Sequence, residues 1–411
     1  MPVPESGARP VRVLHVITRM ILGGAQENTL FTVIGQQRTP GFQVTLLTGV
    51  GDGKEGDLHD RARAAGVDLV VMPSLIRPIR PGVDARALWE LYRFIRRGRY
   101  DVVHTHSSKA GILGRMAARM ARVPVVVHTL HSLVFHEYQK AWQNRVYIGL
   151  KRLCAPMTDV LISVNDRTAQ GALAAGVGRP EQHVTIFSGM DLDPFLSVGG
   201  RLSPDQAKAL VGIPPGVPVM GKIARLFPLK GHEQFFDAAA RVAAARPDAW
   251  FLLVGDGELR ESLQARAREL GIAGRTVFAG LVPPDDVARH IQAMDVVVHT
   301  SLREGIARVI PQALAVGKPV VAFNLDGAPE VVRDGQSGYL VPALDADGLA
   351  ARVVELFGDP ARRDAMGRAG REFVAAHFGV DLMVERINQV YYRLLGPRAP
   401  RPARVAEAAG G

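Results

Sequence analysis

Cysteine is almost absent from this sequence of 411 residues, in which Cys154 stands alone. The chain can form no internal disulfide, which fits a reducing cytoplasm. Long hydrophobic runs are also missing, since no stretch approaches the roughly 18 uncharged apolar residues of a membrane span. The opening residues, MPVPESGARP, lack the apolar segment of a secretory signal. We therefore expect a soluble protein of the cytoplasm.

Aromatic residues are scarce as well, at 6% of the chain. Proteins that bind single-stranded nucleic acid place aromatic side chains among basic ones so that bases stack on them. We therefore expect no nucleic-acid partner, although the formal charge is +10. Residues 1–195 hold 24 Lys and Arg against 16 Asp and Glu, a net of +8. This half would attract phosphates or anionic lipid, or it is simply a solvated basic surface.

Two missing motifs exclude further classes of site. No HExxH and no His/Cys ligand spacing occurs, so we expect neither a metal nor a cofactor. Gly23 and Gly24 precede an expected helix at residues 25–37, and glycines there would let backbone amides approach a phosphate. The GxGxxG fingerprint is not present, which argues against a dinucleotide-dependent oxidoreductase.

What the chain does contain is a regular alternation of short apolar runs and amphipathic stretches. Strands are expected at residues 11–18, 43–47, 68–72, 101–105, 124–128 and 160–164, and again at 219–224, 250–254, 276–278, 296–300 and 319–323. Strands separated by helices predict right-handed βαβ units and parallel sheets. The fold class is therefore α/β, with two doubly wound, Rossmann-like domains facing a central cleft.

The domain limits follow from where this alternation stops and restarts. We expect an N-terminal domain at residues 1–195 and a C-terminal domain at 219–380. The Gly-, Pro- and Asp-rich region 196–218 reads as a linker with a short helix near residues 203–210. A helix at 381–395 follows and is a candidate for packing back onto the first domain, and residues 396–411 are expected to be a disordered tail.

Open α/β sheets bind ligands at the carboxyl ends of their strands, so the loops that follow strands are the places to look for chemistry. Arg225 and Lys230 follow the first strand of the second domain, just before Gly231 and a helix. An Arg that can grip two oxygens and a Lys that acts as a point charge suit a diphosphate. Two exposed loop cations without a ligand are the alternative.

A second loop of that domain carries an acid. Glu304 follows the strand at 296–300, and a helix at 309–316 comes after it. Residues 305–308 would present free backbone amides at that helix start, and Gln312 would lie one turn into the helix. Glu304 and Gln312 could both hydrogen-bond sugar hydroxyls. In the first domain, His131 lies on a loop after the strand at 124–128, whereas His128 should be buried within that strand.

These segments, taken in order, resemble the retaining glycosyltransferases of family 4, which have the two-domain GT-B fold. The resemblance runs from Val11 to about Tyr392 and rests on "GGA" at 23–25, "HTHSSKAGILGR" at 104–115, "HTLHS" at 128–132, "ARLFPLKG" at 224–231 and "REGIARVIPQALAVGKPVVA" at 303–322. It implies sugar transfer from a nucleotide sugar, UDP- or GDP-linked, with retention at the anomeric carbon and no required metal. The first domain would then be the acceptor side and the second the donor side.

The resemblance also implies roles for individual residues. The catalytic set would be His131, Glu304, Lys230 and Arg225, and donor binding would involve Gly23, Gly24, Ile306, Ala307, Arg308 and Gln312. His106 and Lys109 are candidates on the acceptor side. Gln312 stands where the family has a second acid that contacts the nucleotide ribose. A ribose contact takes no part in bond breaking, so we expect the glutamine to weaken donor binding without disarming the enzyme.

The sequence says less about the acceptor of the sugar. Residues 138–154 form an expected helix with an apolar stripe at Trp142, Val146, Leu150 and Leu153. The stripe either packs on the sheet or lies on anionic lipid at the inner face of the cytoplasmic membrane. In the second case the acceptor is a lipid-linked glycan of envelope or exopolysaccharide synthesis. A non-catalytic nucleotide-sugar-binding module and a sugar-nucleotide epimerase, both of GT-B fold, stay open as alternatives.

Overall fold

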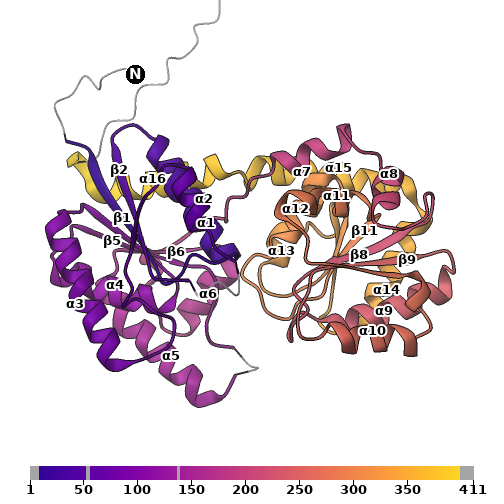
Figure 1. Ribbon diagram of the computed structural model, residues 1–411, viewed down its shortest axis with the longest axis horizontal. Coiled ribbons are helices and arrows are strands. Elements are labelled where there is room, and N and C mark those ends of the chain that lie inside the picture. Colours follow the sequence, from indigo (N-terminus) through magenta and orange to yellow (C-terminus); the bar gives the residue numbers. More distant parts are fainter. Residues whose placement is uncertain (1–8, 52–55, 137–138, 399–411) are drawn as a thin grey trace, which may run out of the picture. The chain divides into compact units, whose positions relative to one another are not determined.

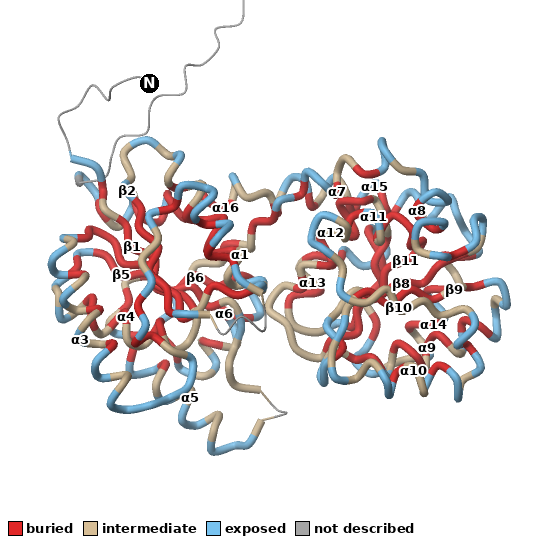
Figure 2. Tube along the Cα trace, in the orientation of Figure 1, coloured by how far each residue is buried: buried red, intermediate tan, exposed pale blue. Residues whose placement is uncertain are grey.

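A computed structural model describes residues 9–51, 56–136 and 139–398 of the chain. It divides into two compact units, Met1–Gly189 with Val380–Gly411, and Met190–Gly379 (Figure 1). Each unit is a parallel sheet covered by helices on both faces, which confirms the predicted α/β class of two doubly wound domains. Figure 2 shows the central strands of both sheets buried and the outer helix faces exposed.

The first unit has a seven-stranded sheet of order β3-β2-β1-β4-β5-β6-β7, in which every paired neighbour is parallel. Its strands are β1 (Val11–Ile17), β2 (Phe42–Thr48), β3 (Asp68–Val71), β4 (Val102–His106), β5 (Val125–Leu130), β6 (Val160–Ser163) and β7 (His183–Thr185). The first six match the predicted runs within two residues at each end. The three residues of β7 are too few to show an apolar period, so the sequence did not predict this strand.

Helices cover both faces of this sheet. The helices are α1 (Gly24–Arg38), α2 (His59–Ala64), α3 (Pro81–Gly98), α4 (Ser108–Met120), α5 (Ala141–Cys154), α6 (Asp166–Ala174) and α16 (Val380–Leu395). One core forms where α1 and α16 pack on the sheet, and a second where α3 and α4 pack on it. The C-terminal helix α16 therefore completes the first unit, as the sequence allowed.

The second unit has a six-stranded parallel sheet of order β10-β9-β8-β11-β12-β13. Its strands are β8 (Val219–Ile223), β9 (Trp250–Val254), β10 (Thr276–Gly280), β11 (Val296–His299), β12 (Val320–Phe323) and β13 (Gly338–Val341). Its helices are α7 (Asp193–Ser197), α8 (Pro204–Leu210), α9 (His232–Ala245), α10 (Arg260–Glu269), α11 (Val287–Gln292), α12 (Val309–Val316), α13 (Ala328–Val331), α14 (Ala346–Gly358) and α15 (Pro360–His377). The edge strand β13 begins at a glycine and was not predicted.

The expected linker at residues 196–218 is not a free connection. Lys208 of α8 is buried and pairs with Asp295 at 3.0 Å, and Gln292 donates to the Leu202 carbonyl at 2.9 Å. These contacts attach the segment to the second unit, which therefore begins at Met190. Residues 399–411 of the expected disordered tail lie outside the described residues.

Candidate active site

The second unit has its topological switch point between β8 and β11, because successive strands are added outward from these two in opposite directions. The loops that follow β8 and β11 are joined there. The amide of Leu302 donates to the Leu229 carbonyl at 2.8 Å, and the hydroxyl of Thr300 donates to the Gly231 carbonyl at 2.6 Å. In doubly wound sheets this is the position where ligands bind.

Lys230 and Glu304 meet at this switch point. The Lys230 ammonium donates to a Glu304 carboxylate oxygen, and both side chains are partly exposed, at 17% and 29%. The two residues are 74 positions apart in the chain, and the sequence placed both on this edge of the sheet. The arrangement offers one cation and one hydrogen-bond acceptor side by side, which suits a ligand that carries a phosphate next to hydroxyl groups.

Gly231 is required where it stands. Its φ of 64° is left-handed, and a Cβ there would lie 1.9 Å from the Thr300 carbonyl oxygen. Beneath the loop, the ammonium of Lys222 donates to the Thr300 hydroxyl at 2.6 Å. Burial, together with the nearby charge of Lys230, lowers the pKa of Lys222 to about 7. Lys222 thus supports the loop that carries Lys230, a role that its place within a strand did not reveal.

Arg225 is exposed, and its guanidinium lies over the ring of Phe227, 5.3 Å from the ring centroid. Its carbonyl accepts a hydrogen bond from His232 Nε2 at 3.0 Å, which anchors the backbone of the loop to the start of α9. The side chain therefore stands at the surface on a fixed backbone. This position is compatible with the predicted contact to a diphosphate.

The Glu304 loop is held by Asp326, which the sequence analysis did not single out. Asp326 accepts from the Glu304 amide at 2.6 Å and pairs with Arg303 at 2.9 Å. The amide of Gly327 also donates to the Gly305 carbonyl at 3.0 Å. The sequence Asp326-Gly327 after β12 could have predicted a tight turn at this place, since Asp tolerates the left-handed φ of 48° that Asp326 adopts.

The remaining predicted donor residues lie around the start of α12. Ile306, Ala307 and Arg308 precede the helix, as expected for amides that face a ligand. Burial lowers the pKa of Arg308 to about 10. Gln312 is half-buried in the first turn of α12. Its backbone N–H donates to the Arg308 carbonyl at 3.2 Å, as in a regular helix.

The first unit has its own switch point, between β1 and β4. Gly23 and Gly24 lie at the start of α1, which follows β1, as the sequence predicted. The ends of the two strands are joined by the Thr18 and Ser107 hydroxyls, 2.8 Å apart. Lys109 forms an ion pair with Asp84 and donates to the Pro78 carbonyl, so it ties α4 to the segment at the start of α3.

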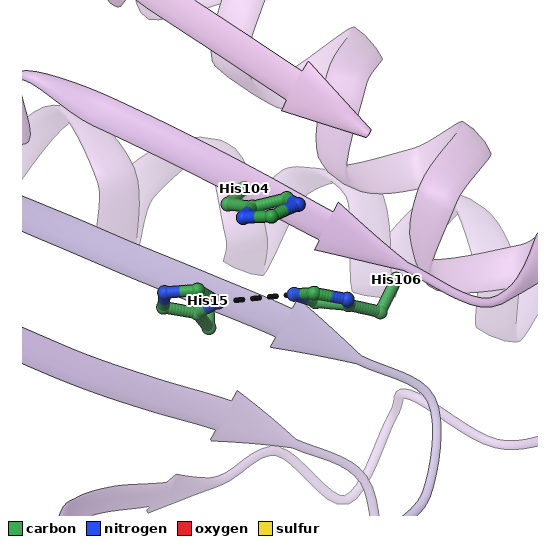
Figure 3. Close-up of side chains that lie close together, drawn as sticks. All are labelled: His15, His104 and His106. Carbon is green, nitrogen blue, oxygen red and sulfur yellow. Dashed lines mark hydrogen bonds between the residues drawn. The ribbon is translucent and has the colours of Figure 1, made fainter. Parts of the chain in front are cut away.

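A cluster of histidines fills the sheet next to this switch point (Figure 3). His15 of β1 and His104 and His106 of β4 are at most 1% exposed, and their ring nitrogens come within 4.8 Å of one another. That spacing would suit a metal, but all six ring nitrogens already have hydrogen-bond partners within the unit. Burial lowers the pKa of all three side chains, so the rings are neutral.

His131 follows β5 and is the outermost histidine of the cluster. Its Nε2 lies 3.2 Å from Nδ1 of His106, and burial lowers its pKa to about 4. His128 is buried within β5, as predicted. His106 was predicted to stand on the acceptor side, but at 1% exposure it has no surface with which to contact an acceptor.

Comparisons with known proteins cover both units. Residues 24–187 match the family described as Glycosyl transferase 4-like domain, and residues 205–373 match Glycosyl transferases group 1. The chain is 29% identical over 386 residues to the UDP-Gal:alpha-D-GlcNAc-diphosphoundecaprenol alpha-1,3-galactosyltransferase of Escherichia coli, covering 93% of this chain and 96% of that one. It is 30% identical over 321 residues to the 2-deoxystreptamine glucosyltransferase of Streptomyces kanamyceticus, covering 76% and 82%.

A likeness in fold extends to solved structures. The chain superimposes on Anabaena HepE, crystallised with UDP and glucose, with a TM-score of 0.76 and 22% identity. The match covers 93% of this chain and all of that one. The two-unit architecture is therefore shared over nearly the whole chain.

Proposed function

The protein belongs to the group 1 glycosyltransferases and has their GT-B fold, and we propose that it transfers a hexose from a UDP-hexose to a lipid-linked acceptor with retention at the anomeric carbon. The observation that carries the proposal is the Lys230–Glu304 pair at the β8/β11 switch point. It supplies a cation for the donor diphosphate and an acceptor for sugar hydroxyls in adjacent positions. UDP is chosen as the nucleotide because the Escherichia coli relative, similar over nearly its full length, is named for UDP-Gal.

In the proposed complex the donor separates this pair. The diphosphate takes over Lys230 and recruits Arg225, whose guanidinium can bind two of its oxygens. Glu304 then accepts hydrogen bonds from the hexose, and the amides of residues 306–308 face the same group. Gln312, on the helix that follows, contacts the ribose.

The proposed reaction needs no protein nucleophile. The acceptor hydroxyl oxygen bonds to C1 of the hexose on the face from which UDP departs. The bond between C1 and the phosphate oxygen breaks, and its electron pair stays on the diphosphate, which also takes the acceptor proton. Lys230 and Arg225 stabilise the charge that develops on the leaving group, the role that a metal ion has in other transferases. A requirement for a metal is therefore not part of the proposal.

The acceptor proposal is supported by helix α5. Its apolar residues Trp142, Val146 and Leu153 are 61%, 51% and 62% exposed, whereas Lys151 and Cys154 face inward and are buried. Leu150, the fourth residue of the predicted stripe, is half-buried, so the unit covers the stripe in part and leaves its other three residues exposed. Tyr138, at the start of the expected helix, lies outside the described residues.

Exposed cations accompany this apolar stripe. Lys140, Arg145 and Arg152 are exposed on or beside α5. Helix α3, which packs on α4 as α5 does, adds with the loop before it exposed arginines at 77, 80, 86, 93, 96 and 97. Apolar residues that insert at the lipid boundary, surrounded by Lys and Arg, suit an anionic membrane surface. Among the described helices, none is long and apolar enough to cross a bilayer. We therefore propose a peripheral position on the inner face of the cytoplasmic membrane.

The donor proposal is tested by thermal unfolding with UDP-, GDP- and ADP-hexoses, using the native protein and Lys230→Ala. A donor at a hundred times its dissociation constant should stabilise the native protein by about 2.7 kcal/mol. We expect a rise in melting temperature with UDP-hexoses that is lost in Lys230→Ala. Because the Lys230–Glu304 pair is partly exposed, the substitution itself should cost no more than about 1 kcal/mol. A shift that persists in the variant would contradict the placement of the diphosphate.

The reaction is tested by supplying the stabilising donor with a polyprenyl-diphosphate sugar in detergent. The expected products are free UDP and an extended lipid-linked sugar with the anomeric configuration of the donor. Release of an altered nucleotide sugar without an acceptor would identify an epimerase instead. Donor binding without any turnover would support a binding module.

A further inference from the structure

We propose that a one-way chain of hydrogen bonds, buried in the first unit, fixes the tautomer of His131. The chain places the ring hydrogen of His131 on Nε2, so that Nδ1 presents a lone pair to the ligand. Gln36, His15 and His106 are then positioning residues that act through His131. The inference rests on the proposed function in one respect only: it identifies the donor of the hydrogen bond that Nδ1 accepts as a sugar hydroxyl.

The direction of the chain is set at its far end by a backbone carbonyl, which can only accept. The Thr39 hydroxyl donates to the Gly35 carbonyl at 3.1 Å, and this uses its single hydrogen. Thr39 Oγ1 must therefore accept from its other neighbour, Asn388 of α16, whose Nδ2 lies 3.3 Å away. This orients the Asn388 amide, with its carbonyl oxygen turned toward Gln36.

The same logic orients the next two groups. Asn388 Oδ1 accepts from Gln36 Nε2 at 2.9 Å, so the Gln36 carbonyl oxygen faces His15. His15 Nε2 lies 2.8 Å from that oxygen and must carry a hydrogen. A neutral imidazole has only one ring hydrogen, so His15 Nδ1 is an acceptor.

The two remaining links carry this polarity to the ligand side. His15 Nδ1 lies 3.0 Å from His106 Nε2, the contact drawn in Figure 3, so His106 carries its hydrogen on Nε2. His106 Nδ1 is then an acceptor for His131 Nε2 at 3.2 Å. His131 therefore also carries its hydrogen on Nε2, which leaves Nδ1 with a lone pair.

The chain depends on the rings being neutral and on no other group reversing it. An imidazolium would turn a donor toward a donor at one of the links, and burial opposes the charge on all three rings. His104 lies against His15 and His106 but has its own partners, the Tyr391 hydroxyl at 2.6 Å and the Thr129 hydroxyl at 2.7 Å. The Tyr391 hydroxyl also hydrogen-bonds the side chain of Gln36. Because Gln36 Nε2 carries a second hydrogen besides the one donated to Asn388, this contact joins His104 to the chain without reversing its direction.

A fixed lone pair at His131 Nδ1 determines which chemical group can bind next to it. It accepts a hydrogen bond from a hydroxyl group and repels a carboxylate, so the group that His131 contacts should be a sugar hydroxyl and not a carboxylate. Because burial lowers the pKa of His131 to about 4, the ring is neutral at neutral pH and its lone pair is available to accept this hydrogen bond.

The tautomer is measured directly by ¹⁵N NMR of the full-length protein labelled at histidine, without substrate, at pH 7.5. The His131 signals are assigned by their loss in His131→Gln. We expect the coupling pattern of a neutral ring protonated at Nε2. A ring protonated at Nδ1, or an imidazolium, would overturn the inference without bearing on whether the protein transfers sugar.

The remote origin of this tautomer is tested at Gln36. In Gln36→Leu the acceptor for His15 is lost, and we expect His131 to become a mixture of tautomers. Gln36→Glu keeps that acceptor. Buried as the neutral acid, its hydroxyl replaces Nε2 as the donor to Asn388 Oδ1, so the native tautomer should be kept. Thr32→Val is the matched control, because Thr32 is buried one turn earlier in α1 and bonds only within the helix or to Met383.

The same variants separate positioning from a merely structural role. Loss of one neutral hydrogen bond to the sugar corresponds to about a five- to tenfold fall in kcat/KM for Gln36→Leu. Gln36→Glu and Thr32→Val should stay close to the native value. An unchanged His131 tautomer in Gln36→Leu would show that the chain does not control it, whatever happens to turnover.

Discussion

At the scale of single residues, the sequence predicted the positions of the charged pair Lys230 and Glu304. It did not predict the residues that hold their loops in place. Lys230 and Glu304 stand where strand ends predict them. Lys222 and Asp326 hold their loops in place by hydrogen bonds to Thr300 and to the Glu304 amide. The Lys230–Glu304 pair is partly exposed and contributes little stability, and ligand binding is the proposed reason for its presence.

Gln312 allows a test in which function is gained. In Gln312→Glu the ribose contact becomes charge-assisted, which should strengthen UDP-hexose binding by about 1 kcal/mol, or five- to tenfold. The side chain is half-buried at the surface of α12, so stability should change little. Isothermal titration of both proteins with UDP measures the difference. Equal or weaker binding by the variant would remove Gln312 from the ribose site.

Lys222 predicts a pH dependence of stability. Its pKa falls from 10.5 to about 7 on folding, so between these pH values the unfolded chain holds more protons and stability rises with pH. In Lys222→Met this contribution is absent. We expect the variant's melting temperature to exceed the native one most at or below pH 7, and the difference to shrink toward pH 10.5. A difference that does not vary with pH would contradict a buried, depressed lysine.

At the scale of elements, α5 is the helix whose environment matters most. It packs through Lys151 and Cys154 and turns most of its apolar stripe outward. Burial lowers the pKa of Lys151 to about 8, an unusual cost for a helix that had an apolar face available for packing. An outward apolar face has a physical reason if it is covered by lipid.

Membrane binding by α5 is tested with Trp142→Asp. Loss of a buried aromatic contact of about 1.5–3 kcal/mol corresponds to roughly a ten- to hundredfold loss of binding. Sedimentation with vesicles containing phosphatidylglycerol measures it, and purely zwitterionic vesicles should bind weakly even to the native protein. Leu210→Asp is the matched control, since Leu210 of α8 is 64% exposed but lies in the second unit. Equal losses of vesicle binding in both variants would indicate non-specific adsorption through exposed apolar side chains and would contradict a specific role of α5.

At the scale of the whole molecule, each unit has a polar cluster near its own switch point, and α16 follows the second unit in the chain and completes the first. Asn388 of that helix contacts Gln36, a residue 352 positions away in the chain. The C-terminal helix is therefore both part of the first core and the anchor of the histidine chain.

The proposed role of Lys230 and Arg225 predicts that turnover does not depend on a metal ion. If two protein cations neutralise the leaving diphosphate, turnover should be unchanged within about twofold after EDTA treatment and removal of the chelator. The measurement is UDP release with and without added Mg²⁺ or Mn²⁺. Activity that disappears with the metal and returns on its addition would require a metal-bound diphosphate and a revised role for Lys230.

Local pattern alone determined the parallel sheets and the strand-end loops that carry Arg225, Lys230, Glu304 and His131, because strand alternation and loop position are properties of short segments. Only the tertiary structure decided which face of α5 is covered, that His106 is buried, and that Lys222 and Asp326 support the loops of Lys230 and Glu304. Periodicity shows that a helix has an apolar stripe but not which neighbour covers it. The histidine chain depends on side chains brought together from β1, β4, α1 and α16, so no local window of the sequence contains it.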